Sequence, residues 1–370
     1  MNILIISPFR IYPIYSGFST RVYNLTKQLS NSNSVFLFYS DYYKKYSAQD
    51  DCDFLPNVKK ICFKVSTKFM QLLHPYLILR GIDVIKEEKI DLIIAEGIWA
   101  GLHAMIFRAL TKVPYCLTEH NVEYVRWKRM GMKYPGLLRM FEKYCCKFSK
   151  KVFCMSEDDR KQINELGVNI NKIITVPNGV DILQFRPEPS KKYEIANKLN
   201  INVESPIIIF SGSLNYTPNL QAVQIIYEKI IDPVLEAVPD AKFVIVGSNP
   251  PLQFKHESII FTGYVEKIED YINASDLIIA PLISGGGTKL KIVEAISCGK
   301  TVITTSVGAE GLIGENTEGF LKVADNWNDF IIKMINSLKS PQSKELPRGF
   351  IKMYSWDSIG NKLCKEITID

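Results

Sequence analysis

Short apolar segments rich in β-branched residues alternate with amphipathic segments along almost the whole chain of 370 residues. In the first half we expect strands at residues 2–7, 35–40, 91–97, 113–120, 151–156 and 173–179, with helices at 19–30 and 68–88. In the second half we expect strands at residues 206–214, 242–248, 259–265, 276–282 and 301–305, with helices at 218–236 and 288–298. Nearly continuous apolar strands that alternate with helices are typical of parallel sheets covered on both faces.

The length of the chain favours two domains over one, because single cores rarely grow to this size. The rhythm of strands and helices is interrupted at VDILQFRP (180–187), where a turn signal and a proline occur. The sequence therefore predicts an α/β protein of two doubly wound sheets, one in residues 1–180 and one in residues 181–350. If the two sheets face each other, the carboxyl ends of their strands surround one cleft.

Composition narrows the class further. Apolar residues make up 46% and charged residues 23% of the chain, the balance of a soluble globular protein. No apolar run reaches the length of about 18 residues that a membrane-spanning helix needs, and MNILIISPF lacks the basic start of a signal peptide, so we expect a cytoplasmic protein. The eight cysteines form no CxxC pair, which argues against a zinc site or a disulfide framework.

The charge is distributed unevenly. Residues 1–180 hold 26 Lys and Arg against 16 Asp and Glu, a balance of +10, whereas residues 181–370 hold 19 against 23, a balance of −4. A basic half can face nucleic acid, anionic lipid or a phosphorylated substrate, and charge alone leaves these three open.

The string ISGGGTKLKIVEAISCGK runs three glycines into an expected helix start. Glycines allow the backbone to approach a ligand, and the amides and dipole of a helix N-terminus favour an anion such as a diphosphate. Lys289 and Lys291 would add positive charge, and Glu294 could accept hydrogen bonds from ribose hydroxyls. The alternative is a flexible loop before a helix on which Glu294 is merely solvated.

Six segments resemble the large retaining glycosyltransferase family 4. They are YSGFSTR (15–21), TEHNVE (118–123), VPNGVD (176–181), GSLNYTPN (212–219), GYV (263–265) and APLISGGGTKLKIVEAISCGKTVITT (280–305). The resemblance implies a GT-B fold of two facing Rossmann-like domains, a nucleotide-sugar donor, retention at the anomeric carbon and no catalytic metal or other cofactor. It also implies that residues 351–370 form a last helix that crosses back to the N-terminal, acceptor-binding domain.

Matched to the family motif, Glu294 is the second glutamate of E-x7-E, which holds the donor ribose. The first glutamate falls on Gly286 and is absent, so contacts to the donor sugar are expected from the amides of Gly286 and Gly287. The family's Arg and Lys pair after the first strand of the second domain is missing too, and Ser213 and Asn219 lie there instead. The expected donor-binding set is Gly17, Ser213, Asn215, Tyr264, Val265, Gly286, Gly287, Thr288 and Glu294.

Three residues are expected to act on the reaction. His120 matches a family histidine that points to the donor sugar, although it could simply satisfy loop backbone. Lys289 and Lys291 are candidates to stabilise the departing diphosphate. On a helix these lysines would point about 200° apart, which favours Lys291 because Glu294 lies on its face.

Basic and apolar residues are interleaved in segment 126–151. Arg126, Trp127, Lys128, Arg129 and Lys133 are candidates for contact with an anionic membrane surface or an acceptor, on the inner face of the cell membrane. The alternative, which the sequence supports equally well, is an amphipathic helix that packs on the sheet of its own domain and has a solvated basic face.

The sequence thus predicts a metal-independent hexosyltransferase that uses a UDP- or GDP-sugar and a glycan or lipid-linked acceptor in cell-surface polysaccharide or glycoconjugate assembly. No nucleic acid partner is expected. A DxD pattern occurs only at Asp51-Cys52-Asp53, in a polar stretch that we interpret as surface. A dehydrogenase would need G-x-G-x-x-G after an opening strand, which is absent. A sugar-nucleotide epimerase and a degenerate, nonenzymatic binding partner remain as alternatives.

Overall fold

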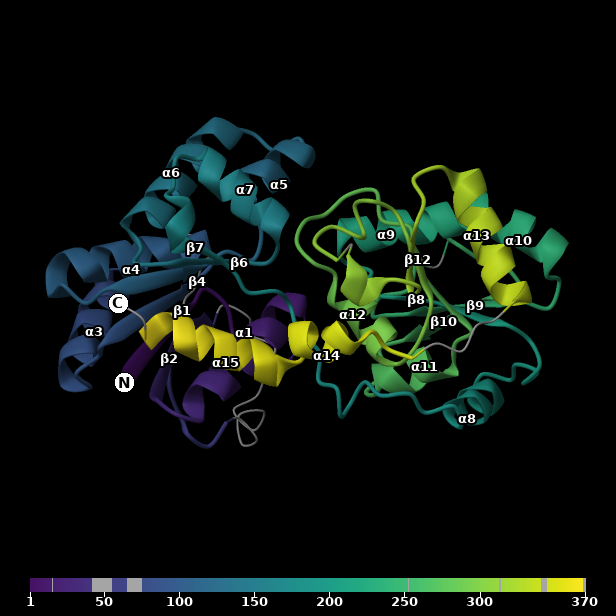
Figure 1. Cartoon of the computed structure of the whole chain (residues 1–370), viewed down its shortest axis with the longest axis horizontal. Helices are drawn as coiled ribbons and strands as arrows, with labels where there is room; N and C mark the ends of the chain where they lie inside the picture. Colours follow the sequence, from purple (N-terminus) through teal and green to yellow (C-terminus); the bar gives the residue numbers. More distant parts are fainter. Residues whose placement is uncertain are drawn as a thin grey trace. The chain divides into compact units, whose positions relative to one another are not determined.

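The computed structural model describes residues 1–14, 16–41, 55–64, 75–251, 253–312, 314–340 and 345–368. The chain divides into two compact units, drawn in Figure 1. Unit 1 consists of Met1–Asn178 and Trp356–Asp370, and unit 2 consists of Gly179–Ser355. The chain therefore passes from unit 1 to unit 2 after Asn178 and returns to unit 1 after Ser355. The boundaries expected from the sequence were after residues 180 and 350.

A parallel sheet forms the centre of unit 1, with the strand order β3-β2-β1-β4-β5-β6-β7 in the described part. Its strands are β1 (Asn2–Ser7), β2 (Ser34–Asp41), β3 (Val58–Lys64), β4 (Leu92–Glu96), β5 (Tyr115–Thr118), β6 (Val152–Cys154) and β7 (Ile173–Thr175). β1 and β4 are almost completely buried, as expected of strands covered on both faces. The edge strand β3 was not predicted.

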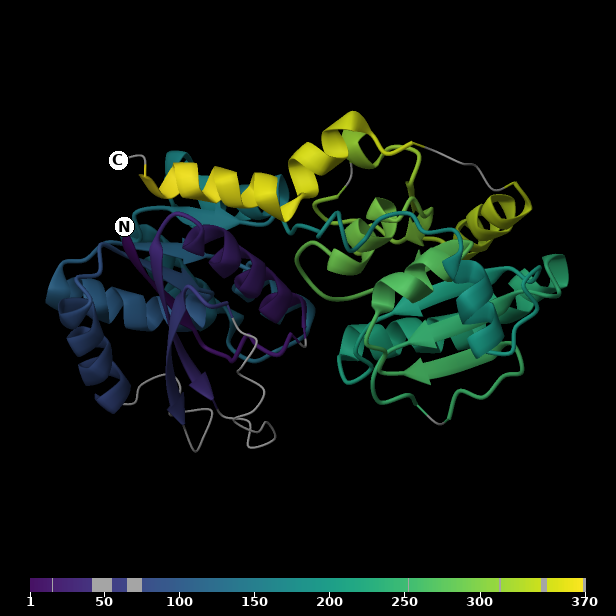
Figure 2. The same cartoon turned by 90° about the horizontal axis from the view of Figure 1, so that it is seen from below.

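Helices cover this sheet: α1 (Gly17–Ser30), α3 (Pro75–Glu87), α4 (Ile98–Thr111), α5 (Glu123–Arg129), α6 (Pro135–Phe148), α7 (Glu157–Glu165) and the C-terminal α15 (Trp356–Thr368). α15 lies beside α1, as Figures 1 and 2 both show. Gly360 makes room for this packing, since a Cβ there would lie 2.4 Å from Cβ of Gln28, and Gln28 donates a hydrogen bond to Asp357. Residues at the two ends of the sequence thus share unit 1.

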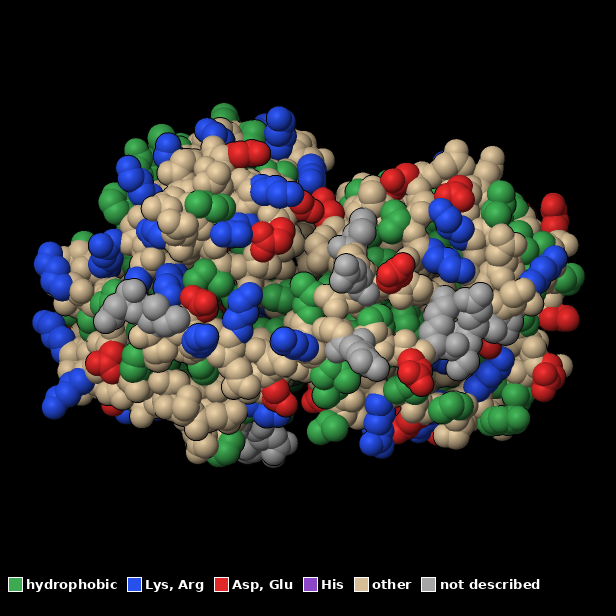
Figure 3. Space-filling model, viewed as in Figure 1, with side chains coloured by type: hydrophobic (Ala, Val, Ile, Leu, Met, Phe, Trp, Pro, Cys, Tyr) green, Lys and Arg blue, Asp and Glu red, His purple; other side chains and the backbone are tan. Residues whose placement is uncertain are grey.

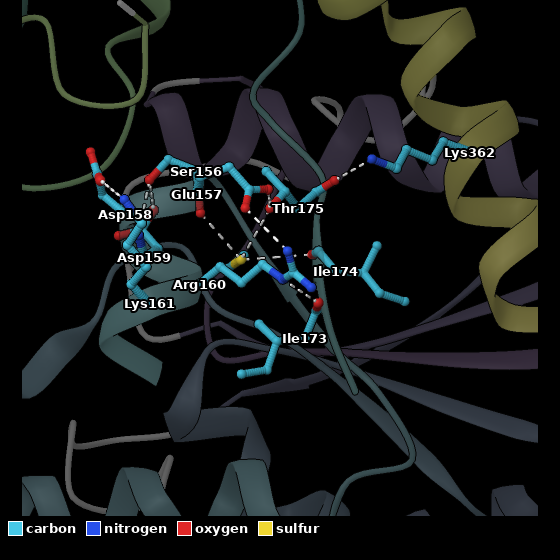
Figure 4. A network of polar contacts seen from close by, with 11 residues as sticks. Ser156, Glu157, Asp158, Asp159, Arg160, Lys161, Ile173, Ile174, Thr175 and Lys362 are labelled. Carbon is cyan, nitrogen blue, oxygen red and sulfur yellow. Dashed lines mark hydrogen bonds and ion pairs between the residues drawn. The ribbon is translucent and has the colours of Figure 1, made fainter. Parts of the chain in front are cut away.

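A polar network joins the start of α7 to β7 and α15 (Figure 4). Ser156 caps α7 by accepting a hydrogen bond from the amide of Asp159 at 3.1 Å, and Arg160 donates to the carbonyl of Ile173 at 3.0 Å. Lys362 of α15 donates to the carbonyl of Thr175 at 2.7 Å. The C-terminal helix is therefore fixed to the sheet of unit 1 by hydrogen bonds as well as by packing.

Unit 2 is built on a second parallel sheet, with the strand order β10-β9-β8-β11-β12-β13 in its described part. The strands are β8 (Ile207–Ser211), β9 (Lys242–Val246), β10 (Ile259–Gly263), β11 (Leu277–Ala280), β12 (Val302–Thr304) and β13 (Leu321–Val323). The short edge strand β13 was not predicted. The central strands β8 and β11 are fully buried.

The helices of unit 2 are α8 (Lys191–Lys198), α9 (Thr217–Ile225), α10 (Ile231–Ala237), α11 (Ile268–Ala274), α12 (Leu290–Ser297), α13 (Trp327–Lys339) and α14 (Arg348–Tyr354). A π-helical segment, Ile226–Ile230, joins α9 to α10, so the helix expected at 218–236 contains a bulge in its middle. α12 begins at Leu290, two residues later than expected. That difference changes the role of Lys289, as described below.

Candidate functional site

Two loops meet at the carboxyl ends of β8 and β11 in unit 2. β8 and β11 are adjacent parallel strands, so the segments that follow them leave the sheet side by side. Ser284 donates a hydrogen bond to Gln221 at 2.7 Å, and Gly285, with φ of +114°, lies against Tyr216 and Pro218. The glycine loop expected from the sequence is therefore packed on the first turns of α9 rather than free.

Lys291 occupies the centre of this arrangement. Its Nζ donates a hydrogen bond to Oδ1 of Asn219 at 3.0 Å and lies 4.4 Å from the centre of the Phe210 ring. Asn219 is buried and donates in turn to the carbonyl of Ser213 at 2.8 Å. Gly212 leaves space for both side chains, since a Cβ there would lie 2.6 Å from Asn219 and 2.8 Å from Nζ of Lys291.

Burial lowers the pKa of Lys291 to about 7, and the neighbouring charge of Lys289 lowers it further, while Glu294 acts in the opposite direction. An anion beside Nζ would restore the charged form. The arrangement is suited to bind a ligand with more negative charge than Glu294 alone supplies.

Glu294 lies one turn after Lys291 on α12. Burial raises the pKa of its carboxyl group to about 7; Lys291 lowers it, and Glu269 of α11 raises it. Among the described residues, none donates a hydrogen bond to this carboxylate. A partly buried acceptor in this state can take hydrogen bonds from neutral hydroxyl groups of a ligand.

Lys289 does not lie on the helix, so the expectation of two helical lysines pointing apart is wrong for this residue. It occupies the N-cap of α12 with extended backbone, φ of −90° and ψ of 103°. Its Nζ donates to the carbonyls of Gly286, at 3.1 Å, and Gly287. Lys289 therefore holds the glycine loop closed on itself, whereas Lys291 extends to Asn219 in the first turn of α9. Thr288 beside it is buried.

The structure brings together only part of the expected donor-binding set. Ser213 contributes its carbonyl to Asn219, and Asn215 in the same loop is exposed. Tyr264, which is 76% exposed, and Val265 follow β10, and β10 is separated from β11 by β9 and β8. Tyr264 and Val265 therefore lie along the same edge of the sheet but away from the glycine loop.

A second polar cluster lies at the carboxyl end of the sheet in unit 1. Nε2 of His120 lies 2.8 Å from Oε2 of Glu96, whose side chain is 3% exposed. The ring of Phe18 lies 4.5 Å from that of His120, which places the start of α1, and with it the exposed Gly17, beside the histidine. Sequence reasoning identified His120 but missed its partner. The signal in the sequence was that Glu96 and His120 each lie at the end of an expected strand.

Arg21 explains why two distant motifs of the sequence belong together. This α1 residue is 1% exposed and donates hydrogen bonds at 2.7 Å to the carbonyls of Val176 and Pro177, and at 3.3 Å to the side chain of Asn178. The YSGFSTR loop is therefore fixed to the VPNGVD segment. No pattern in the sequence alone indicated this contact.

The basic segment forms α5, a turn and α6. Arg126 is paired with Glu123 at 2.7 Å, and the ring of Trp127 lies 6.4 Å from that of Trp99, so these two expected surface residues are engaged within the unit. Lys128, Arg129 and Lys133 are exposed. The exposed large apolar residues here are Met130, Met132, Tyr134, Leu137, Met140, Tyr144 and Phe148.

Leu137, Met140, Tyr144 and Phe148 follow helical spacing on α6 and share one face. Glu142 is the single acidic residue of segment 124–151, and it is fully buried. In Figure 3 green apolar and blue basic side chains lie over α5 and α6, at the upper left, with a red acidic side chain among them. The packing alternative therefore accounts for the buried face of α6 and leaves this apolar, basic face unexplained.

Within the described ranges, no three His, Cys, Asp or Glu side chains are grouped so that they could hold a metal ion. No described helix combines the length and apolar character needed to cross a bilayer. Asp51-Cys52-Asp53 and the N-terminal part of the helix expected at 68–88 lie outside the described residues.

Two parallel α/β sheets with polar clusters at the carboxyl ends of their strands are the architecture of GT-B glycosyltransferases. Sucrose-phosphate synthase from Thermosynechococcus elongatus superposes with a TM-score of 0.77 at 16% identity, covering 99% of this chain and 98% of that one. HepE from Anabaena, in complex with UDP, superposes with a TM-score of 0.76 at 16% identity over the whole of both chains. These likenesses establish the predicted GT-B fold.

Family models account for most of both units. The model of Glycosyltransferase Family 4 matches residues 15–183, and the model of Glycosyl transferases group 1 matches residues 205–340. The chain belongs to glycosyltransferase family 4.

Curated relatives of the chain are distant. A UDP-Gal:alpha-D-GlcNAc-diphosphoundecaprenol alpha-1,3-galactosyltransferase of Escherichia coli is 26% identical over 269 residues, 68% of this chain and 67% of that protein. An uncharacterised glycosyltransferase of Methanocaldococcus jannaschii is 23% identical over 373 residues, 95% of this chain and 94% of that protein. Identity at this level gives no substrate for this chain.

Proposed function

We propose that this glycosyltransferase moves a hexose from a nucleoside diphosphate sugar to a glycan or lipid-linked acceptor, with retention of anomeric configuration and without a metal ion. The observation on which the proposal rests is the group formed by Lys291, Asn219 and Glu294 beside the glycine loop of unit 2. It combines a partly desolvated cation with a carboxylate that lacks a donor among the described residues.

The two charged residues fit opposite ends of a ribose diphosphate. Lys291 would face the phosphates, where a desolvated ammonium group interacts strongly with charge that grows on the leaving group. Glu294 would accept hydrogen bonds from ribose hydroxyls. Gly286 and Gly287 would approach the donor sugar through their backbone, since Lys289 already binds their carbonyls and leaves their amides for a ligand.

The ligands and substrates of similar proteins support a UDP-type donor over a GDP-type donor. HepE has been crystallised with UDP and with UDP-glucose, and the Escherichia coli relative uses UDP-Gal and a diphosphoundecaprenol-linked sugar. An O-antigen biosynthesis glycosyltransferase of Escherichia coli is 23% identical over 269 residues, 67% of this chain. Assembly of a cell-surface polysaccharide on a lipid carrier is the role that these similarities favour.

The test is a thermal-shift and transfer screen with UDP, GDP, UDP-glucose, UDP-galactose and GDP-mannose. We expect a UDP compound to raise the melting temperature in proportion to occupancy of the folded state. Product analysis with the donor alone tests the epimerase alternative, because an epimerase interconverts the donor without an acceptor. Binding without turnover would favour the degenerate binding partner.

We further propose that the exposed face of α5 and α6 rests on the anionic inner surface of the cell membrane and brings the enzyme to a lipid-linked acceptor. Exposed Lys128, Arg129 and Lys133 supply positive charge, and the face of α6 with Leu137 and Met140 supplies apolar contact. The combination of both on one face, without an exposed acidic residue in segment 124–151, supports this partner over a second protein.

Vesicle sedimentation tests this proposal. Each basic residue near an anionic surface contributes about 1 kcal/mol, so Lys128→Gln with Lys133→Gln should weaken binding to phosphatidylglycerol-containing vesicles roughly thirtyfold. The matched control is Lys86→Gln with Lys89→Gln, which removes two exposed lysines elsewhere in unit 1. Equal loss in both double variants, or binding that ignores salt, would contradict the proposal.

A further inference from the structure

The buried carboxylate of Glu96 lies at the carboxyl end of β4, and no motif of the sequence includes this residue. It is the last residue of β4, and the parallel register pairs it with Thr118 at the end of β5. Gly97, with φ of +81°, then donates its amide to the carbonyl of Thr118 at 2.8 Å. The chain turns sharply there, so the carboxylate of Glu96 stays beside the residues that follow β5.

The contact between Glu96 and His120 is short and shielded. Oε2 of Glu96 lies 2.8 Å from Nε2 of His120, with side-chain exposures of 3% and 12%. Shielded from water, this hydrogen bond is stronger than a surface pair of the same length. Phe18 covers the imidazole at a ring distance of 4.5 Å and is itself in edge contact with Phe9.

The buried guanidinium of Arg21 interacts electrostatically with Glu96. Burial lowers the pKa of Arg21 to about 10, and Glu96 is the strongest influence that raises it. Arg21 is held by the carbonyls of Val176 and Pro177, so its position is fixed independently of Glu96. A carboxylate oxygen can only accept, so as a carboxylate Glu96 accepts a hydrogen bond from Nε2–H of His120.

We propose that Glu96 is a positioning residue for His120: it holds the proton on Nε2, fixes the ring, and leaves Nδ1 as the nitrogen that faces a ligand. This inference rests on the proposed sugar transfer only for its kinetic consequence. Within the described part of the chain, Nδ1 of His120 has no hydrogen-bond partner. A neutral imidazole whose Nε2 donates to a carboxylate presents Nδ1 as an acceptor, so a sugar hydroxyl is the ligand chemistry that matches it.

The structural half of the proposal is tested by NMR on the full chain labelled with ¹⁵N-histidine. The resonances of His120 are assigned as those missing from the spectrum of the His120→Asn variant. We expect a downfield, slowly exchanging Nε2–H resonance for His120, which Glu96→Gln shifts upfield and Glu96→Ala abolishes. Glu87→Gln, on the exposed surface of α3, is the matched control and should leave it unchanged. A proton on Nδ1 instead, or no response to the Glu96 variants, would overturn the pairing.

The kinetic half uses a double-mutant cycle with the UDP-sugar found active in the donor screen. Glu96→Gln should lower kcat about tenfold or more while the dissociation constant of UDP stays within about twofold, because UDP does not need the imidazole. In the His120→Asn background the same substitution should change kcat by less than about threefold. Additive losses would overturn a role through His120. Inactivity of the wild type would instead count against sugar transfer, with the NMR result still deciding the pairing.

Discussion

Binding of a nucleoside diphosphate should take up a proton at alkaline pH. In the free protein burial lowers the pKa of Lys291 to about 7, so at pH 8 only about one tenth of the molecules hold the charged amine. A diphosphate beside Nζ favours the charged form and raises this pKa. The complex should therefore hold close to one more proton at Lys291 than the free protein.

Glu294 contributes in the opposite sense. Its pKa is raised by burial to about 7, and hydrogen bonds from ribose hydroxyls lower it again, so binding releases its proton. At pH 8 only about one tenth of Glu294 remains protonated, which limits the release to about 0.1 proton. The net uptake at pH 8 should be about 0.8 proton per UDP and should shrink towards zero near pH 7.

Isothermal titration calorimetry in phosphate and in Tris buffers measures this uptake, because the two buffers differ in ionisation enthalpy. We expect the apparent binding enthalpy of UDP at pH 8 to differ between the buffers by the enthalpy of about 0.8 proton. Lys291→Met should abolish the difference, whereas Asn219→Ala should retain most of it. Identical enthalpies in both buffers for the wild type, or an unchanged uptake in Lys291→Met, would refute the reasoning.

Three further outcomes are expected. Transfer activity should persist in excess EDTA, and loss that manganese or magnesium restores would contradict a metal-free mechanism. Burial raises the pKa of Glu142 to about 7 and that of Glu119 well above its usual range, so the folded state holds protons that the unfolded chain releases. The free energy of unfolding should therefore fall as the pH rises from about 4.5 through 7, by about 3 kcal/mol for Glu142 alone. In denaturant titrations at pH 8, Glu119→Gln should be more stable than the wild type. Equal stability of Glu119→Gln and the wild type across this pH range would contradict the prediction. Gly247→Ala should lower the free energy of unfolding by about 1 to 3 kcal/mol, because its Cβ would lie 2.0 Å from the carbonyl oxygen of Gly212. In the control Gly136→Ala, the added Cβ meets nothing within 4 Å, so this variant should unfold at the wild-type temperature or above.

The sequence predicted the two sheets because their central strands are uniformly apolar. β3 and β13 were missed for different reasons. VKKICFK mixes lysines and apolar residues without strict alternation or a continuous apolar run, and LKV is too short to give a period. The bulge in residues 226–230 has no sequence signature that we recognise.

The site was predictable where it depends on spacing along one helix. Lys291 and Glu294 lie one turn apart on α12, so they stay together in any packing of that helix. Lys289 was misplaced because the helix begins after it, and helix ends are the least certain part of a sequence pattern. The contacts of Asn219 with Lys291 and of Glu96 with His120 depend on strand order and register, which the sequence alone does not specify.

The most direct test of the account is the dissociation constant of UDP for the wild type, Lys289→Met, Lys291→Met and Glu294→Gln, measured at pH 7 with folding confirmed. A charge-assisted hydrogen bond contributes about 1.5 to 3 kcal/mol, so Lys291→Met and Glu294→Gln should each weaken UDP by roughly tenfold to more than a hundredfold. Lys289→Met, which loses hydrogen bonds to the carbonyls of the glycine loop, should stay within about threefold of the wild type. Wild-type affinity in both Lys291→Met and Glu294→Gln would mean that the donor binds elsewhere.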